Sequence, residues 1–318
     1  MSLRAFACAA ALLTAVTACS GDDADPASGA TGADGSGQQI EVTHDLGTLA
    51  LDGEVTRVVT TSDETTELVV ALGLQPVGIA STRIDTTSAS PLEGYYLPAD
   101  RLGEPEIVGG EEVDVEQVAA LEPDLVVHGS EDGQVDALSG VAPTVVFDVQ
   151  APGAWERALA ELGEATGRAE QAESVTGDYA AAVAAAREEL APVASRYPRI
   201  GVIYPQYRGG ADNYLFDEDF ALASVIPQLG FELAGSDRAE EAFPGVQQIS
   251  AEAYSSIQAD LLLALGTEPW QETTSAPVLE VLPVPVLGVA LDDGQPSTGP
   301  ITSPALLERY VAALQAAA

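Results

Sequence analysis

Short apolar runs alternate with apolar-periodic segments along most of the chain. Runs typical of buried strands stand at 57–61, 76–80, 124–128 and 144–147, and again at 199–204, 260–265 and 284–290. Between them, apolar positions spaced by three and four predict helices at 67–72, 113–121, 220–230 and 304–316. Continuous apolar strands separated by helices are typical of parallel sheets covered on both faces. The pattern therefore predicts an α/β fold with two doubly wound, Rossmann-like lobes.

Residues 155–197 have no strand character. Trp155, Leu159 and Leu162 predict a short amphipathic helix. Apolar residues then recur at spacings of three and four, at Val175, Tyr179, Val183, Ala186 and Leu190. A helix from about residue 168 to about residue 190 would be roughly 35 Å long. The sequence therefore predicts one long, stiff α-helix joining the two lobes.

The two halves of the chain repeat one segment. Residues 113–127 and 249–263 align at a constant offset of 136 positions. Each segment carries a glutamate, then apolar residues at helical spacing, then an aspartate that opens an apolar strand. The glutamates are Glu116 and Glu252, and the aspartates are Asp124 and Asp260.

The N-terminal residues predict export and anchoring. Arg4 precedes the uncharged stretch 5–18, which is shorter than the roughly 20 residues of a membrane span and suits a secretory signal. The stretch ends in Val-Thr-Ala-Cys, which resembles a bacterial lipobox, and the alternative is an ordinary signal peptide with a stray cysteine. Residues 20–38, rich in Gly, Ser, Ala and Asp, predict a flexible tether. We therefore expect a signal peptide (1–18), a lipidated, palmitate-bearing Cys19 with its tether (19–39), and a mature protein on the extracytoplasmic face of the cell membrane.

Composition excludes several classes of function. The chain has 318 residues, 46% of them hydrophobic, and its 12 basic residues, all arginine, face 50 acidic ones. A net charge of −38 disfavours binding to nucleic acid. Only two cysteines, both N-terminal, and two histidines occur, so we predict neither a resident metal nor another cofactor. No nucleophile elbow, Walker loop or zinc-protease motif is present, and we expect no enzyme, a carboxylate-pair hydrolase being the remaining enzymatic alternative.

Several motifs occur in a characteristic order. They are the lipobox, Arg57-Val-Val, Thr66-Glu67-Leu68, Pro76-Val77-Gly78-Ile79, Val108-Gly109 and Leu121-Glu122-Pro123-Asp124-Leu125-Val126-Val127. Together they resemble the iron/vitamin B12 class of substrate-binding proteins of ABC importers, over about residues 55–313. The resemblance implies two lobes joined by one helix, a ligand cleft between the lobes, and an ABC permease dimer with its cytoplasmic ATPase as partner. We expect the N-terminal lobe at 40–150, the connecting helices at 151–197 and the C-terminal lobe at 198–318, in a monomer.

Ligands of doubly wound sheets bind beyond the carboxyl ends of the strands. Aromatic rings can lie against a chelate, and guanidinium groups can bond its oxygens in pairs. The candidate ligand-binding residues in the loops after the predicted strands are Arg83, Tyr95, Tyr96, Tyr204, Tyr207, Arg208, Tyr214 and Trp270. The alternatives are core packing for Tyr204, surface ion pairs for Arg83 and Arg208, and a structural plug at the lobe edge for Trp270.

The charges available in the predicted loops restrict which of the ligands implied by this resemblance we expect. A tris-catecholate iron complex is strongly anionic, whereas the chain offers no lysine and three arginines, counting Arg238, to such a site. We therefore expect a ferric siderophore of the hydroxamate or mixed type, whose chelator holds the iron. Haem, with His128 or a tyrosine as axial ligand, and cobalamin are the alternatives of the same fold. A lipoprotein that binds a partner without transport is a further alternative.

Glu116 and Glu252 occupy equivalent positions near the start of two predicted helices. A carboxylate in a first turn is favoured by the helix dipole, which is the structural explanation of each residue taken singly. The resemblance implies instead that one carboxylate per lobe meets arginines of the two permease subunits. We therefore predict that Glu116 and Glu252 are permease-docking residues.

Overall fold

The computed structural model describes residues 39–84, 92, 95–110, 112–130, 132–149, 151–205, 213–267, 269–291 and 298–318. Three residues predicted to be functional, Cys19, Tyr207 and Arg208, lie outside these ranges. The described chain begins with an antiparallel hairpin, β1 (Gln39–His44) and β2 (Gly47–Asp52). The sequence patterns did not predict this hairpin, because only Val42 and Leu51 on it are buried.

The first sheet has five parallel strands in the order β5-β4-β3-β6-β7. Their bounds are β3 Val58–Thr60, β4 Gly78–Ala80, β5 Glu106–Gly109, β6 Leu125–His128 and β7 Thr144–Val146. The helices between them are α1 Asp63–Ala71, α2 Ala99–Leu102, α3 Val115–Ala120 and α4 Val135–Ser139. We call this part the N-lobe. The strand order reverses between β3 and β6, and this reversal is the point at which such sheets bind ligands.

The second sheet, in what we call the C-lobe, combines parallel and antiparallel strands. The parallel strands are β10 Glu232–Leu233, β8 Arg199–Tyr204, β13 Leu261–Gly266 and β14 Val286–Ala290. The antiparallel strands are β9 Tyr214–Phe216, β12 Val246–Gln248 and β11 Glu240–Phe243. The sequence predicted only parallel strands here. The antiparallel strands were missed because β9, although apolar, is only three residues long, and because β11 and β12 are short and largely polar or exposed.

Helices cover both faces of the second sheet. They are α7 Ala221–Gln228, α8 Ala276–Leu279, α9 Thr302–Gln315 and two 3-10 helices, η2 Ala251–Ser256 and η3 Trp270–Glu272. Successive residues of β13 enter different cores: Leu261 and Leu263 pack with α7 and α9, whereas Leu262 packs with η2 and α8. This alternation, repeated in the N-lobe at Val58 and Val59, confirms the predicted doubly wound lobes.

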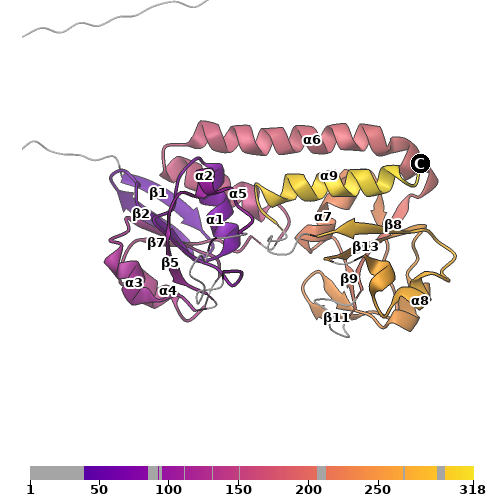
Figure 1. Ribbon diagram of the computed structural model, residues 1–318. Coiled ribbons are helices and arrows are strands. Elements are labelled where there is room, and N and C mark those ends of the chain that lie inside the picture. The colour runs from indigo at the N-terminus through magenta and orange to yellow at the C-terminus, as the bar shows by residue number, and fades with distance from the viewer. Residues whose placement is uncertain are drawn as a thin grey trace, which may run out of the picture. The chain divides into compact units, whose positions relative to one another are not determined.

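Two helices follow the first sheet, α5 (Ala154–Ala165) and α6 (Ala169–Arg196). Helix α6 runs beside both sheets, with α9 next to it (Figure 1). Ala172 is buried in an N-lobe core and Leu190 in a C-lobe core, so the long connecting helix is confirmed. It has 28 residues and passes through Pro192, whereas the sequence placed its end near residue 190. No helix in the described part of the chain is long and apolar enough to cross a membrane.

The structure explains the aspartates of the internal repeat. The carboxylate of Asp124, just before β6, accepts the backbone N–H of Arg57 at 2.9 Å, just before β3. Asp260, just before β13, accepts the N–H of Arg199 at 3.0 Å at the start of β8, and also pairs with the Arg199 guanidinium. Each aspartate therefore ties together the first residues of two neighbouring central strands, which is a requirement shared by both lobes.

Candidate functional site

The N-lobe gathers polar side chains around Asp63, the first residue of α1. Asp63 is 5% exposed, and Ser62 before it caps the helix. Its Oδ1 accepts hydrogen bonds from the hydroxyls of Ser81 at 2.6 Å and Tyr95 at 2.5 Å, and its Oδ2 pairs with Nε of Arg83 at 3.1 Å. One buried carboxylate therefore organises groups that follow β3 and β4 at the carboxyl edge of the sheet.

Arg83 is the cation of this cluster. Its side chain is 28% exposed, whereas that of its partner Asp63 is 6% exposed, so the pair differs from an ordinary surface ion pair. Asp63 engages Nε, and among the described residues nothing accepts from the two Nη groups. A guanidinium held at one edge by a buried carboxylate can bond two ligand oxygens at its other edge.

Tyr95 and Tyr96 lie beside Arg83 as an edge-to-face pair, with ring centroids 4.8 Å apart. The Tyr96 hydroxyl donates to the backbone oxygen of Asp63 at 3.1 Å. Burial, reinforced by the charge of Asp63, raises the pKa of Tyr95, and burial together with Glu67 raises the pKa of Tyr96. Both tyrosines are therefore neutral phenols in this structure, and Asp63 accepts a hydrogen bond from each hydroxyl.

His128 closes β6 next to this cluster and is 3% exposed. Its Nδ1 shares a hydrogen bond of 2.6 Å with the hydroxyl of Thr61, and its Nε2 lies 3.1 Å from Oδ1 of Asp132. Both ring nitrogens are therefore engaged within the protein. This arrangement is what a structural histidine requires.

The C-lobe candidates Tyr204 and Tyr214 are neighbours on β8 and β9, whereas Trp270 follows β13. Tyr204 is 6% exposed in the hydrophobic core, and its register partner on β9 is the half-buried Tyr214. The ring of Tyr214 lies 6.2 Å from that of Phe243, a 51% exposed aromatic residue on β11 that the sequence patterns did not single out. Trp270 begins η3 after β13, is half-buried, and packs against the C-lobe core. The structure thus brings Arg83, Tyr95 and Tyr96 together, and leaves Tyr204 as a packing residue.

Glu116 and Glu252 have matching surroundings. Each is the second residue of its helix, α3 and η2, and both are exposed. Within the described ranges neither carboxylate has a hydrogen-bond or ion-pair partner. The two carboxylates are therefore available to a partner molecule.

The sequence patterns did not single out Asp63, the acid that organises the N-lobe site, or its partner Ser81. A buried acid on a short helix has the same sequence signal as an exposed one. The partners of this carboxylate, Ser81, Arg83 and Tyr95, lie after β4 and before α2, 18 to 32 positions away. The described residues contain no cluster of His, Cys, Asp and Glu that could hold a metal ion.

The fold has two doubly wound lobes joined by one helix. Together with the polar and aromatic side chains at the carboxyl edge of the first sheet, it is typical of an α/β binding protein. The chain belongs to the periplasmic binding protein family: the profile described as "Periplasmic binding protein" matches residues 58–281, more than half of the chain. This membership confirms the predicted family.

Individual proteins of known type are similar to the chain. The "Ferric enterobactin-binding periplasmic protein FepB" of Escherichia coli is 26% identical over 204 residues, which cover 61% of this chain and 62% of FepB. The "Probable siderophore-binding lipoprotein YfiY" of Bacillus subtilis is 26% identical over 194 residues, which cover 60% of this chain and 56% of YfiY. The chain thus spans less than two thirds of the length of these relatives.

The crystal structure of Staphylococcus aureus SirA complexed with staphyloferrin B superposes on the chain with a TM-score of 0.67. The match covers 86% of this chain and 98% of SirA at 21% sequence identity. At this identity the likeness shows the fold alone.

Proposed function

We propose that this protein is the extracytoplasmic substrate-binding protein of an ABC importer and that it captures a ferric siderophore in a cleft between its lobes. It binds and releases the chelate without chemical turnover. The observation that carries the proposal is the Arg83 guanidinium, held by the buried Asp63 beside two tyrosines at the carboxyl edge of a parallel sheet. The names of FepB and YfiY, which both refer to siderophores, support the same ligand class.

The chemistry of the cluster suits an oxygen-rich, flat or apolar chelate. The Nη groups of Arg83 donate to chelate oxygens, while the rings of Tyr95 and Tyr96 lie against its carbon framework. Tyr207, Arg208, Tyr214 and Trp270 contact the chelate from the C-lobe side, and the exposed Phe243 next to Tyr214 extends that aromatic surface. The iron stays within the chelator, so the protein itself needs no metal ligands.

Charge favours a hydroxamate or mixed-type siderophore over a tris-catecholate. In the described N-lobe site Arg83 is the basic residue, and Asp63 already balances its charge. The negative charge of a tris-catecholate complex would therefore not be neutralised at this site, and the net charge of −38 would repel the complex. FepB, which is named for ferric enterobactin, is 26% identical to the chain over 204 residues, and an identity this low leaves the ligand type to be decided by the charge of the site.

Haem is the weaker candidate. A haem-ligating His128 would have to break its hydrogen bonds to Thr61 and Asp132 and leave a site where it is 3% exposed. Tyr95 and Tyr96 would have to break the hydrogen bonds that their hydroxyls donate to the carboxylate and to the backbone oxygen of Asp63. Both changes oppose axial ligation of haem iron by these residues.

Delivery requires a place at the membrane and a docking surface. We propose that Cys19 is the mature, lipid-modified N-terminus and that residues 20–38 tether the lobes to the membrane. Glu116 and Glu252, one exposed carboxylate per lobe, bind arginines of the two permease subunits. YfiY is named as a lipoprotein, which supports the lipid anchor.

Titration of the protein lacking residues 1–38 tests the function. Ferrioxamine B, ferric enterobactin, haemin and cyanocobalamin are added in turn, and quenching of tyrosine and tryptophan fluorescence is followed. We expect saturable binding of one equivalent of the ferric hydroxamate, weaker binding of the others, and no conversion of the bound chelate. Tight binding of haemin with an iron-ligation spectrum, or failure of every ferric chelate to bind, would contradict the proposal.

A further inference from the structure

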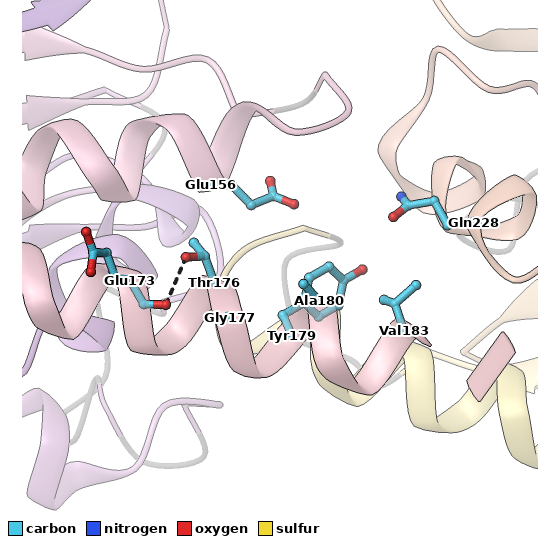
Figure 2. A pocket seen from close by; sticks show the side chains of 8 residues that line it. All are labelled: Glu156, Glu173, Thr176, Gly177, Tyr179, Ala180, Val183 and Gln228. Carbon is cyan, nitrogen blue, oxygen red and sulfur yellow. Dashed lines mark hydrogen bonds between the residues drawn. The ribbon is translucent and has the colours of Figure 1, made fainter. Parts of the chain in front are cut away.

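A pocket lies away from the strand edges, between α5, α6 and α7. It has a volume of about 450 Å³, within the range of small-molecule sites. Glu156 of α5 extends over α6 toward Gln228 at the end of α7, and Tyr179 and Val183 of α6 form its floor (Figure 2). The pocket is thus built from helices of both lobes and from the helix that joins them.

The apolar part of the pocket is firmly positioned. Tyr179 is half-buried and packs against the cores of both lobes. Its ring meets that of Trp155 edge-to-face, with centroids 5.4 Å apart, and Val183 beside it is 7% exposed. Because these groups belong to the two cores, the pocket floor is rigid enough to present a defined surface to a ligand.

One polar group of the pocket lacks a hydrogen-bond partner. Oε2 of Glu156 is buried and has no hydrogen-bond partner. Burial raises the pKa of Glu156, and burial together with the smaller effect of the Glu156 charge raises the pKa of Tyr179 to about 12. The pocket is lined by a second carboxylate, Glu173, and by no basic side chain. A carboxylate oxygen that is buried without a donor costs free energy, which a cationic ligand would recover.

The open side of the pocket is formed by small residues of α6. Gly177 sits in the interior of this helix, where glycine is less favourable than alanine by about 0.5–1 kcal/mol. A Cβ placed there would meet nothing within 4 Å, so packing does not demand the glycine. Gly177 and Ala180 together leave the approach to Glu156 and Tyr179 unobstructed.

From the under-bonded Glu156 carboxylate, the fixed aromatic floor and the absence of any lining base, we propose that this pocket binds a small organic cation. An ammonium or amidinium group of the ligand donates to Glu156, and its apolar body packs on Tyr179 and Val183. This site is separate from the proposed siderophore site, and its occupant touches both lobes at once. The inference does not depend on the identity of the siderophore.

Benzamidinium is a suitable probe because it joins a planar cation to an aromatic ring, and benzamide is its neutral counterpart. Binding to the protein lacking residues 1–38 is measured by saturation-transfer NMR and calorimetry. We expect saturable one-to-one binding of benzamidinium in the millimolar range and at least tenfold weaker binding of benzamide. Glu156→Gln removes the charge with little change in shape, and should weaken benzamidinium binding tenfold to a hundredfold.

Two further variants complete the test. Glu188→Gln changes an exposed acid of α6 outside the pocket and should leave binding unchanged. Gly177→Leu fills the open side on an exposed helical face, and should abolish binding while the fold becomes no less stable. Equal binding of benzamide and benzamidinium, an unchanged affinity in Glu156→Gln, or no saturable binding to the folded protein would overturn the proposal. None of these outcomes bears on ferric-chelate binding, which is measured separately.

Discussion

Glu67 of α1 accepts the backbone N–H of Thr302, the first residue of α9, at 3.0 Å across 235 positions of the chain. The same oxygen also accepts the N–H of Ile301 at 2.9 Å and the hydroxyl of Thr302 at 3.2 Å. Helix α9 has no side-chain cap of its own, so a carboxylate of the N-lobe caps a helix of the C-lobe. Glu67 is fully buried, and its other oxygen has no partner.

Burial raises the pKa of Glu67 to about 7, although the N–H groups of Thr302 and Ile301 favour the charged form. The folded state therefore holds the proton more tightly than the unfolded state, and stability is lost as pH rises from the ordinary glutamate value through about 7. Glu67→Gln removes this titration while its amide oxygen can still accept from α9. We expect the free energy of unfolding of the wild type, relative to Glu67→Gln, to fall by about 3 kcal/mol between about pH 4 and about pH 8.

Urea unfolding of both proteins across this pH range measures the difference. Glu188→Gln, at an exposed site, serves as control and should follow the wild-type profile. A constant difference between wild type and Glu67→Gln would show that Glu67 does not titrate between the two states.

Position 299 needs a glycine because the carboxylate of Glu67 lies directly against its Cα. A Cβ at Gly299 would collide with Oε2 of the Glu67 carboxylate. Gly299→Ala should therefore lower the free energy of unfolding by about 2 kcal/mol. Gly177→Ala, where a Cβ meets open space, should instead be neutral or stabilising. If the steric explanation holds, Gly299→Ala costs less in a Glu67→Ala background, and an equal cost in both backgrounds contradicts it.

Arg83→Ala should weaken binding of the ferric chelate tenfold to a hundredfold, because a charge-assisted hydrogen bond to a chelate oxygen is lost. Asp63→Asn should weaken chelate binding because the carboxylate that orients Arg83 and Tyr95 is lost.

Arg208→Ala should also weaken chelate binding tenfold to a hundredfold. Fluorescence titration gives the affinities, and Arg101→Ala, at an exposed arginine of α2, is the control. Wild-type affinity in folded Arg83→Ala would remove Arg83 from the site.

Cys19→Ala should release the protein from membranes or leave an unprocessed precursor, because the thiol that carries the lipid is absent. Fractionation of cells followed by mass spectrometry of the N-terminus measures both outcomes. Cys8→Ala is the matched control, since it changes a cysteine inside the signal peptide. Membrane retention of a normally processed Cys19→Ala protein would contradict the anchor.

Glu116→Ala and Glu252→Ala should leave chelate affinity unchanged and reduce iron uptake, with the double variant more impaired than either single one. Replacement by arginine should be more severe, since like charges would then meet at the permease. Affinity and cellular uptake are measured side by side, with Glu188→Ala as control. Normal uptake by the double variant would exclude these residues from docking.

The sequence by itself determined the two doubly wound lobes and the long helix between them. A strand covered on both faces, such as 199–204, is a continuous apolar run because its successive side chains all leave water. The apolar positions from Tyr179 to Leu190 recur every three or four residues because one face of the helix is buried. Asp124 and Asp260 were visible in the sequence because they repeat. Each carboxylate accepts a backbone N–H at the start of the neighbouring strand, and both lobes share this hydrogen bond.

Only the tertiary structure decided which polar residues meet. Asp63 gathers Ser81, Arg83 and Tyr95 from positions 18 to 32 residues away, and Glu67 caps a helix 235 residues away. The environment of such carboxylates is set by long-range packing, which leaves no periodic signal along the chain. The same holds for the antiparallel strand β11, whose exposed residues form a strand because β12 offers hydrogen bonds, not because the residues are apolar.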